Sequence, residues 1–466
     1  MSEFHYSDIH CHPNLKTFGH SFDKNANRKS HLWYYSLPAF LSRQIHKYTG
    51  ITKFTQTDFS TMARAGAKII FVSLYPFEKG LFINKNLSLA VAAFLADWGT
   101  EIGYNRVKYL QEHKDYFKDL QNEYDFFVGG EKQYTIDGKL FRWEIANNWK
   151  EVNSILKEEN TTAVILSIEG GHVFNSGLDA FGVDSDEKEI LSNLQAVKNW
   201  DHVPLFMGLA HNFNNDLCGH ARSLQRIGKL VNQENNIDNG ISVIGNKVIH
   251  ALLDDTNGKR IYIDLKHMSV KSRQEYYAIL KVTYPRQKIP LIVSHGSVTG
   301  LSFSGSKRAT TCLDIFNTND LNFFDEEIME VAKSGGLFAI QMDIGNNADL
   351  QKLKTVLSAN YSRSLKTSAQ IIWNQLQYIA ELLDSEGLYA WGCTSIGSDF
   401  DGSINPFPEI LTATGFSHLA NELVEPVEIF LSSYPFKLAE NKNISSIEIV
   451  DRFIYLNTVN FLQLFY

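Results

Sequence analysis

Two histidines near the start of the sequence stand at a spacing that suits metal binding. His10 and His12 are two residues apart, so on an extended strand both side chains project from the same face and can bind one ion. Imidazole nitrogen is a common zinc ligand, and a catalytic zinc site has about three protein ligands and an open position for water. The remaining ligands must therefore come from other segments, unless this pair simply lies on the surface.

Three further residues, each at the end of an apolar run, are candidates for those ligands. Glu169 follows such a run and precedes two glycines, which let a backbone or a ligand approach closely. A carboxylate buried there is costly unless it is paired or binds a metal, and its two oxygens can each bind one ion. His267 and His295 also follow apolar runs. The alternatives are a salt bridge for Glu169 and hydrogen-bonded core positions for both histidines.

A pair of aspartates adds a candidate for proton transfer. Asp399 and Asp401 flank Phe400, and Gly402 predicts a turn that separates their roles, one as a general base and the other in capping a loop. The segment also resembles part of a calcium-binding loop, but the later ligands of such a loop are missing. The sequence contains no motif typical of nucleotide binding or of serine hydrolases.

Eight short apolar runs, separated by segments of helical spacing, are the elements that must position these residues. This pattern is typical of β-α units around a parallel sheet, and eight units close a barrel. Catalytic groups of such barrels lie at the C-terminal ends of the strands, and six of the eight runs end in His, Glu or Asp. The runs span 4–9, 68–74, 163–168, 204–210, 260–265, 290–293, 336–342 and 391–396, and helical patterns span 186–200, 270–282 and 368–383.

The connections over residues 12–65 and 76–162 are much longer than the roughly 2–6 residues usual between such units. We expect extra helices there, one or two of them within 87–120, and a helix packed on the body at 453–466. Internal repeats and linker-like tracts are absent from the sequence. The predicted fold is therefore α/β: residues 1–466 form one TIM-type (β/α)8 barrel with a helical insertion at about 76–162.

Composition narrows the classes of partner. The 466 residues are 44% hydrophobic and 21% charged, which is ample for a packed core. The net charge of −8 is spread without long blocks, so no basic face for nucleic acid or anionic lipid is indicated. No run approaches the roughly 18 apolar residues that span a bilayer, and no signal peptide is visible. We expect a cytoplasmic protein with no nucleic-acid partner and no transmembrane segment, unless a leader has been removed.

Taken together and in order, these segments resemble the membrane (renal) dipeptidase family of zinc peptidases, within the amidohydrolase superfamily. The resemblance runs from about residue 5 to the C-terminus. It rests on segments 8–12, 57–76, 167–172, 209–212, 263–267, 290–295 and 397–402, and the end of the chain resembles the closing helix of the family.

The resemblance implies a binuclear centre of two zinc ions, although another divalent metal would suit the same ligands. By this similarity one ion would be bound by His10 and His12, the other by His267 and His295, and both by Glu169. The residues that the resemblance implies as ligands are the candidates named above.

The resemblance also implies a reaction and a substrate. A hydroxide bridging the ions would attack the peptide carbon of a dipeptide, and Asp399 would pass the proton to the departing amine. His211 would contact the substrate and steady the tetrahedral intermediate. A homodimer is implied as well.

Two departures from the family pattern bear on specificity. The family has Asp where this chain has His12, so the centre would hold one negative charge fewer. The family also has an Arg that receives the free carboxylate of the substrate, where this chain has Leu321 ahead of Asn322. The surrounding loop, at about 301–321, is enlarged, and Arg308 could substitute there or be a solvated loop residue.

Three functions fit these observations. A dipeptidase acting on short peptides is favoured. An amidohydrolase acting on another amide or on a lactone is the alternative if the loop around Arg308 binds no carboxylate. A metal-binding or partner-binding protein without turnover fits less well, because a purely structural zinc site needs neither an open position nor a proton shuttle such as Asp399.

Overall fold

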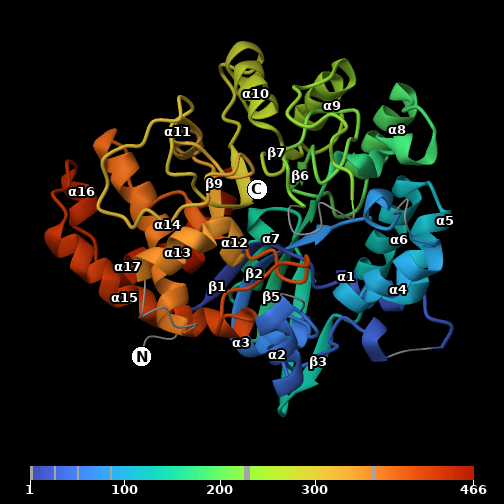
Figure 1. The fold of residues 1–466 in the computed structure, drawn as a ribbon, viewed down its shortest axis with the longest axis horizontal. Coiled ribbons are helices and arrows are strands. Elements are labelled where there is room, and N and C mark those ends of the chain that lie inside the picture. The colour runs from blue at the N-terminus through green and yellow to red at the C-terminus, as the bar shows by residue number, and fades with distance from the viewer. Residues whose placement is uncertain (1–3, 26–27, 50–51, 84–86, 225–230, 358–363) are drawn as a thin grey trace.

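The computed structural model describes residues 4–25, 28–49, 52–83, 87–224, 231–357 and 364–466. Its main sheet contains eight parallel strands, which lie next to one another in chain order, with helices around them (Figure 1). Each strand overlaps one predicted run. The strands are β1 (Tyr6–Cys11), β2 (Ala67–Leu74), β5 (Thr161–Ile168), β6 (Phe206–Gly208), β7 (Tyr262–Asp264), β8 (Ile292–Gly296), β9 (Leu337–Ile340) and β10 (Thr394–Ile396).

The residues that follow β10 return to β1 and nearly close the sheet. The backbone N–H of Asp399 donates to the carbonyl of His10 at 2.9 Å, and that of His12 donates to the carbonyl of Phe400 at 3.0 Å. These bonds join the first and the last strand of the path. The prediction of a (β/α)8 barrel is therefore confirmed.

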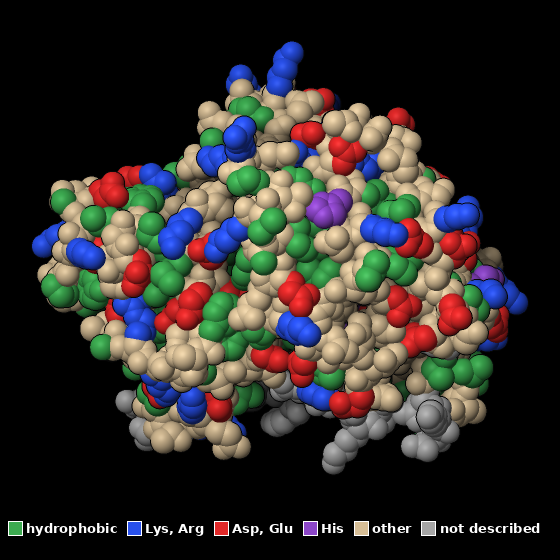
Figure 2. Space-filling view, turned by 90° about the horizontal axis from the view of Figure 1, so that it is seen from above, with side chains coloured by type: hydrophobic (Ala, Val, Ile, Leu, Met, Phe, Trp, Pro, Cys, Tyr) green, Lys and Arg blue, Asp and Glu red, His purple; other side chains and the backbone are tan. Residues whose placement is uncertain are grey.

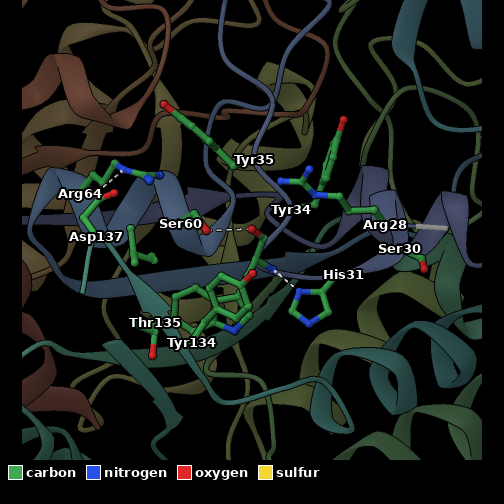
Figure 3. Close-up of a pocket in the computed structure, with 12 residues that line it drawn as sticks. Arg28, Ser30, His31, Tyr34, Tyr35, Ser60, Arg64, Tyr134, Thr135 and Asp137 are labelled. Atoms are coloured by element: carbon green, nitrogen blue, oxygen red, sulfur yellow. Dashed lines mark hydrogen bonds and ion pairs between the residues drawn. The ribbon is translucent and has the colours of Figure 1, made fainter. Parts of the chain in front are cut away.

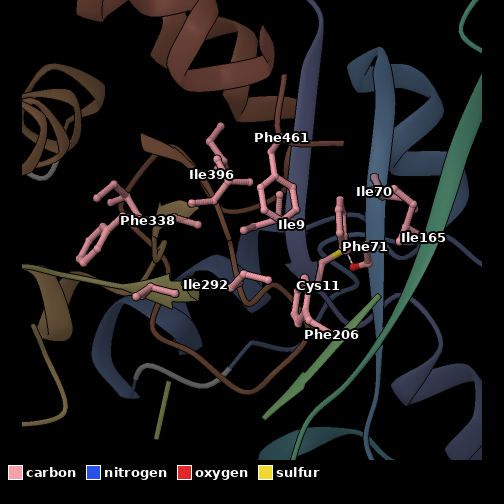
Figure 4. Packing of buried hydrophobic residues seen from close by; sticks show 14 of the residues in the cluster. Ile9, Cys11, Ile70, Phe71, Ile165, Phe206, Ile292, Phe338, Ile396 and Phe461 are labelled. Carbon is pink, nitrogen blue, oxygen red and sulfur yellow. Dashed lines mark hydrogen bonds between the residues drawn. The ribbon is translucent and has the colours of Figure 1, made fainter. Parts of the chain in front are cut away.

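The strands are buried along their length, and their side chains alternate between two faces. In β1, Ile9 and Cys11 project from one face, whereas Asp8 and His10 project from the other. The apolar set packs with other strands: the Cys11 thiol contacts the carbonyl of Phe71 at 3.4 Å, in the cluster shown in Figure 4. Alternation thus places the polar set of β1 on a single face.

The three predicted helical patterns correspond to α8 (Glu187–Lys198), α10 (Val270–Thr283) and α14 (Leu365–Ser385). The C-terminal segment forms a π-helical turn (Arg452–Leu456) followed by α18 (Asn457–Phe465). The side-chain amide of Asn457 donates to the carbonyls of Trp391 and Thr394, and the Ser7 hydroxyl bonds to that of Thr458. The expected packing of this end on the barrel is confirmed. The other helices of the second half are α9 (Val243–Leu253), α11 (Asp325–Ser334), α12 (Ile344–Asn347), α13 (Leu350–Leu357), α15 (Phe416–Ser433), α16 (Ala439–Lys442) and α17 (Ser446–Asp451).

The long early connections hold extra helices, as expected, but residues 76–162 are not purely helical. Their last part forms an antiparallel hairpin whose second strand pairs in parallel with the first half of β5. The hairpin turns at Asp137 and Gly138, both with positive φ, and Asp-Gly is a strong hairpin signal that the helical prediction overlooked. The elements are α1 (Leu15–His20), α2 (Phe40–Thr49), α3 (Phe59–Ala65), α4 (Leu89–Thr100), α5 (Tyr104–Glu112), α6 (Tyr116–Val128), β3 (Gln133–Ile136), β4 (Lys139–Ile145) and α7 (Trp149–Ile155).

Charged side chains of both signs are mixed over the face shown in Figure 2. This mixing agrees with a net charge that is spread along the sequence without long blocks. Of the helices in the described ranges, none combines the length and the apolar character needed to cross a membrane.

Candidate metal centre

Seven of the predicted site residues lie at the C-terminal ends of barrel strands, and all seven are buried. Because all strands of the barrel run in parallel, these ends share one face of the barrel, where the reaction centres of such folds lie. The residues come from or directly follow β1, β5, β6, β7, β8 and β10: His10, His12, Glu169, His211, His267, His295 and Asp399.

Glu169 stands at the centre of this group and contacts five imidazoles. Its Oε1 lies 3.5, 3.4 and 3.6 Å from the Nε2 atoms of His10, His267 and His295. The Nε2 of His211 lies 3.5 Å from the same oxygen, and that of His12 lies 3.3 Å from Oε2. One carboxylate therefore presents its two oxygens to histidines from four strands, an arrangement able to contact two cations.

The positions and chemistry of these side chains fit the needs of a metal ion. Three groups of side chains each bring three ligand atoms within 4.8 Å of one another. The Nε2 atoms of His10 and His12 are buried and have no hydrogen-bond partner among the described residues, which is rare for buried polar atoms. Nitrogen and carboxylate ligands in this number suit zinc. The groups are His10, His12 and Glu169; Glu169, His211 and His267; and His10, His295 and Asp399.

Two of the histidines, His12 and His295, are held so that Nε2 faces the centre. The Nδ1 of His12 lies 3.1 Å from the carbonyl of Ser73, which can only accept a proton. The Nδ1 of His295 lies 2.8 Å from the Ser294 hydroxyl, which itself donates to Asp264 and therefore accepts from the ring. With the proton on Nδ1, the Nε2 lone pair is free for an ion, as in the outer shells of known metal sites.

Two buried aspartates, which the sequence analysis did not single out, each accept two hydrogen bonds from the serine that precedes a site residue. Asp264 accepts from the backbone N–H of Ser294 at 2.9 Å and from its hydroxyl at 2.5 Å, and Ser294 precedes His295. Asp8 accepts in the same way from Ser398, which precedes Asp399. Burial raises the pKa of Asp8 to about 6, against the effect of the Ser398 hydrogen bonds. Each aspartate thus fixes the residue just before a site residue on the neighbouring strand.

The two aspartates of the last turn have different surroundings. The Oδ1 of Asp399 faces the histidines, 3.5 Å from Nε2 of His12 and 3.9 Å from that of His10. Asp401 instead accepts from the backbone N–H groups of Gln56 and Thr57, both at 2.9 Å. Asp399 therefore belongs to the centre, whereas Asp401 holds a loop.

Two site residues have a strained backbone. His267 and Asp399 adopt φ values of 66° and 59°, in the left-handed region that non-glycine residues rarely occupy. Such strain persists only where the surrounding contacts enforce it, and it clusters at functional sites.

The surroundings of the centre shift the pKa values of its histidines in opposite directions. Burial opposes the charge of His12, but the nearby carboxylates of Asp399 and Glu169 raise its pKa to about 10. Burial, together with the charge on His211, lowers the pKa of His267 to about 3. Burial would raise the pKa of Glu169, but His211 and His10 hold it well below the usual value. These interactions hold Glu169 ionised and His267 uncharged, so the carboxylate could attract a cation and the imidazole could offer it a nitrogen lone pair.

Glu78, in the loop after β2, is a buried carboxylate that the sequence analysis did not single out. Its Oε2 accepts from Nδ1 of His211 at 2.6 Å and from the hydroxyl of Tyr75 at 3.0 Å. Its Oε1 accepts from the backbone of Asn212 and Phe213. Burial opposes its charge, but His211 lowers its pKa to about 2. Glu78 therefore holds His211 with Nε2 towards Glu169.

Replacing Glu78 by Gln is expected to lower kcat/KM about 10–100-fold, as the loss of outer-shell partners does at metal sites. The amide keeps the volume but removes the charge that fixes the His211 proton on Nδ1. Steady-state kinetics and bound metal per chain measure the effect. Tyr75→Phe, which removes one neutral donor to the same oxygen, is the control and should change kcat/KM much less; equal losses in both variants would contradict the role of the charge.

Arg308 lies away from this group. Its Nη2 donates to the carbonyl of Glu381 at 3.1 Å and to the hydroxyl of Ser385 at 2.9 Å. Both partners are in the last turns of α14, which lead to the N-terminal end of β10, whereas the histidines lie at the C-terminal ends. The substrate-binding role expected for Arg308 therefore has no support in its contacts.

A cavity of about 650 Å³ lies outside the centre, between the segment before α2, α3 and the β3–β4 hairpin. Figure 3 shows Arg28, Tyr35, Arg64 and Tyr134 around it. None of its lining residues belongs to the histidine group. The site is therefore identified by the convergence of ligands rather than by this cavity.

Comparison with known proteins gives the fold. No family model and no curated protein matches the chain. A metallopeptidase described as dipeptidase AC is similar over 99% of this chain and 98% of its own, with a TM-score of 0.53 and 13% identity. The metallopeptidase of Rhodobacter sphaeroides, solved with a phosphinate mimic of the dipeptide L-Ala-D-Ala, is similar over 99% of both chains, with a TM-score of 0.51 and 12% identity. PvdM of Pseudomonas aeruginosa, described as a probable dipeptidase, covers 98% of this chain and 94% of its own, with a TM-score of 0.50 and 13% identity. At such identities the likeness shows the shared fold alone.

Proposed function

We propose that this protein is a metal-dependent hydrolase of the membrane dipeptidase kind that cleaves the peptide bond of dipeptides and other short peptides. The observation that carries the proposal is the position of Glu169 between five histidines at the C-terminal ends of the barrel strands. Further support comes from solved structures of the same fold that are described as dipeptidases or metallopeptidases.

Two zinc ions fit the donor set. His10 and His12 with Glu169 would hold one ion, and His267 and His295 with Glu169 the other. His211 is close enough to Glu169 and His267 to act as a ligand as well as a substrate contact. Bound ions would supply Lewis acidity towards the amide carbonyl and towards water.

The residues of the chain would do the rest of the chemistry. Asp399, through Oδ1, would take a proton from the attacking water and deliver it to the departing amine, a role worth about 10²–10⁴-fold. His211, held by Glu78, would present Nε2 to the carbonyl oxygen of the substrate. Burial of the group excludes bulk water, which strengthens each of these interactions.

A second candidate, hydrolysis of another amide or of a lactone, is favoured by one observation. Arg308 contacts α14 and not the centre, so it offers no cation for a free substrate carboxylate. This second candidate would use the same metal centre. It differs only in the substrate, which would carry no free carboxylate next to the bond that is cleaved.

Metal analysis followed by a substrate panel tests both candidates. We expect about two zinc ions per chain and faster hydrolysis of dipeptides with a free C-terminus than of the same dipeptides with a blocked one. Equal turnover of blocked dipeptides or of lactones would select the second candidate. Less than one metal per chain, with no hydrolysis of any amide after zinc is added, would overturn the proposal of an enzyme. Light scattering tests the implied homodimer.

A further inference from the structure

Gln341, directly after β9, is a buried residue whose side chain connects Asp399 with Lys266 and Asn346. Its Nε2 donates to Oδ2 of Asp399 at 2.8 Å. Its Oε1 accepts from Nδ2 of Asn346 at 2.7 Å and from Nζ of Lys266 at 3.5 Å. The residue is only 3% exposed, and its amide has three hydrogen-bond partners among the described side chains, Asp399, Asn346 and Lys266.

The partners of Gln341 allow its amide only one orientation. A carboxylate can only accept hydrogen bonds and a lysine ammonium can only donate them. Rotating the amide by 180° would set Oε1 against the Asp399 carboxylate and the NH₂ group against Lys266. Both contacts would then be repulsive. The side chain is therefore held with its donor towards Asp399.

Lys266 strengthens the hydrogen bond between Gln341 and Asp399. It is 1% exposed, and no carboxylate of the described ranges forms an ion pair with it within 4.0 Å. A buried ammonium without a partner is costly, so its contact with Oε1 of Gln341 matters more than an exposed contact of the same length. The positive charge also polarises the amide and strengthens the donation from Nε2 to Asp399.

We propose that Gln341 is a positioning residue for Asp399, kept in one orientation by Lys266 and Asn346. By engaging Oδ2 it fixes the plane of the carboxylate and leaves Oδ1 facing His10 and His12. This inference rests on the proposed function for its kinetic consequence, but the geometry it describes does not depend on turnover.

The test compares two substitutions of Gln341 with similar volume. Gln341→Leu removes both ends of the amide, whereas Gln341→Glu keeps the acceptor for Lys266 and replaces the donor to Asp399 by a second carboxylate oxygen. Both variants are expected to lower kcat about 10–100-fold, with KM and bound metal close to wild type. If Gln341 only filled space, the glutamate in Gln341→Glu, which has the same shape, would serve equally well. That variant would then keep the kcat of the wild type.

A double-mutant cycle separates positioning from general destabilisation. If Lys266 acts through Gln341, then Lys266→Met in the Gln341→Leu background should add little to the loss of kcat. Additive losses would overturn the link between the two residues. Asn346, which is less buried, supplies a milder variant: Asn346→Ala should lower kcat less than Gln341→Leu, and it keeps the test open if the buried variants fold poorly.

Asn457→Leu is the matched control, because Asn457 is a buried amide that donates to carbonyls around the start of β10, at the opposite end of the barrel. It should lower thermal stability and leave kcat unchanged. The visible absorption of the cobalt-substituted protein gives a readout without turnover, and Gln341→Glu should alter it in the same direction as Asp399→Asn. If Gln341→Glu shifts the spectrum but the wild-type protein hydrolyses no substrate, the proposed function is wrong and the positioning of Asp399 stands. An unchanged spectrum together with an unchanged kcat in Gln341→Glu would overturn the positioning role.

Discussion

Replacing Asp399 by Asn is expected to lower kcat about 10²–10⁴-fold while the protein keeps its metal. The amide has the same shape, and Gln341 would still find an oxygen to which it can donate. The other end of the side chain, which faces His10 and His12, would become an NH₂ group that cannot take up a proton. Steady-state kinetics on a dipeptide and metal analysis of the same sample measure the two quantities.

Asp401→Asn is the control for this change, because it lies in the same turn and its carboxylate binds the 56–57 backbone and Lys16 rather than the histidines. We expect this variant to lose thermal stability and to retain most of its kcat. Loss of metal together with kcat in Asp399→Asn would contradict the proton-transfer role and would make Asp399 a ligand instead.

Replacing Glu169 by Gln is expected to abolish activity and to reduce bound metal to less than half of the wild-type content. Among the residues that the structure describes, Glu169 is the only carboxylate that contacts all five imidazoles, so an amide at this position removes the negative charge that both ions would share. Metal sites bind through deprotonated ligands, and a neutral amide is a much weaker one. Metal content after dialysis against zinc and hydrolysis by the same preparation give the result.

Glu187→Gln is the matched control on an exposed carboxylate of α8, which forms an ion pair with Lys247. Surface pairs of this kind contribute little to stability, so metal content and kcat should both stay at the wild-type level. Full metal occupancy in Glu169→Gln, with kcat within about tenfold of wild type, would refute the shared-carboxylate arrangement.

The barrel could be predicted because two simple patterns coincide in the sequence. Apolar runs mark the strands, and the parallel arrangement then forces their polar C-terminal neighbours together. This pattern predicts that His267 and His295 lie together, although 28 residues separate them, and in the structure their Nε2 atoms lie 3.3 Å apart. Burial and strand order are encoded locally, so these features can be read from one sequence.

The supporting residues could not be predicted in the same way. Gln341 lies inside the predicted run 336–342, of which only Leu337–Ile340 forms β9, and a glutamine at its end has no acid-base or metal chemistry that would mark it as a site residue. Its importance comes from Lys266 and Asp399, which reach it from two other strands. The direction of Arg308 could not be predicted either, since a cation in an enlarged loop carries no sign of where it points; its contacts are with α14. The β3–β4 hairpin had a readable signal at Asp137-Gly138, which the expectation of helices obscured.

The contact between the two ends of the chain has a consequence for biosynthesis. Asp8 binds Ser398 across a separation of 390 residues, and the neighbouring backbone bonds between His10 and Asp399 bridge nearly the same length. A ribosome delivers β1 long before the last strand of the barrel. Until then the nascent chain carries histidines without Asp399 and without the bonds that fix β1. The proposed centre is thus complete only after β10 has been made, and an ion bound earlier would meet the histidines and Glu169 without the proton-transfer residue.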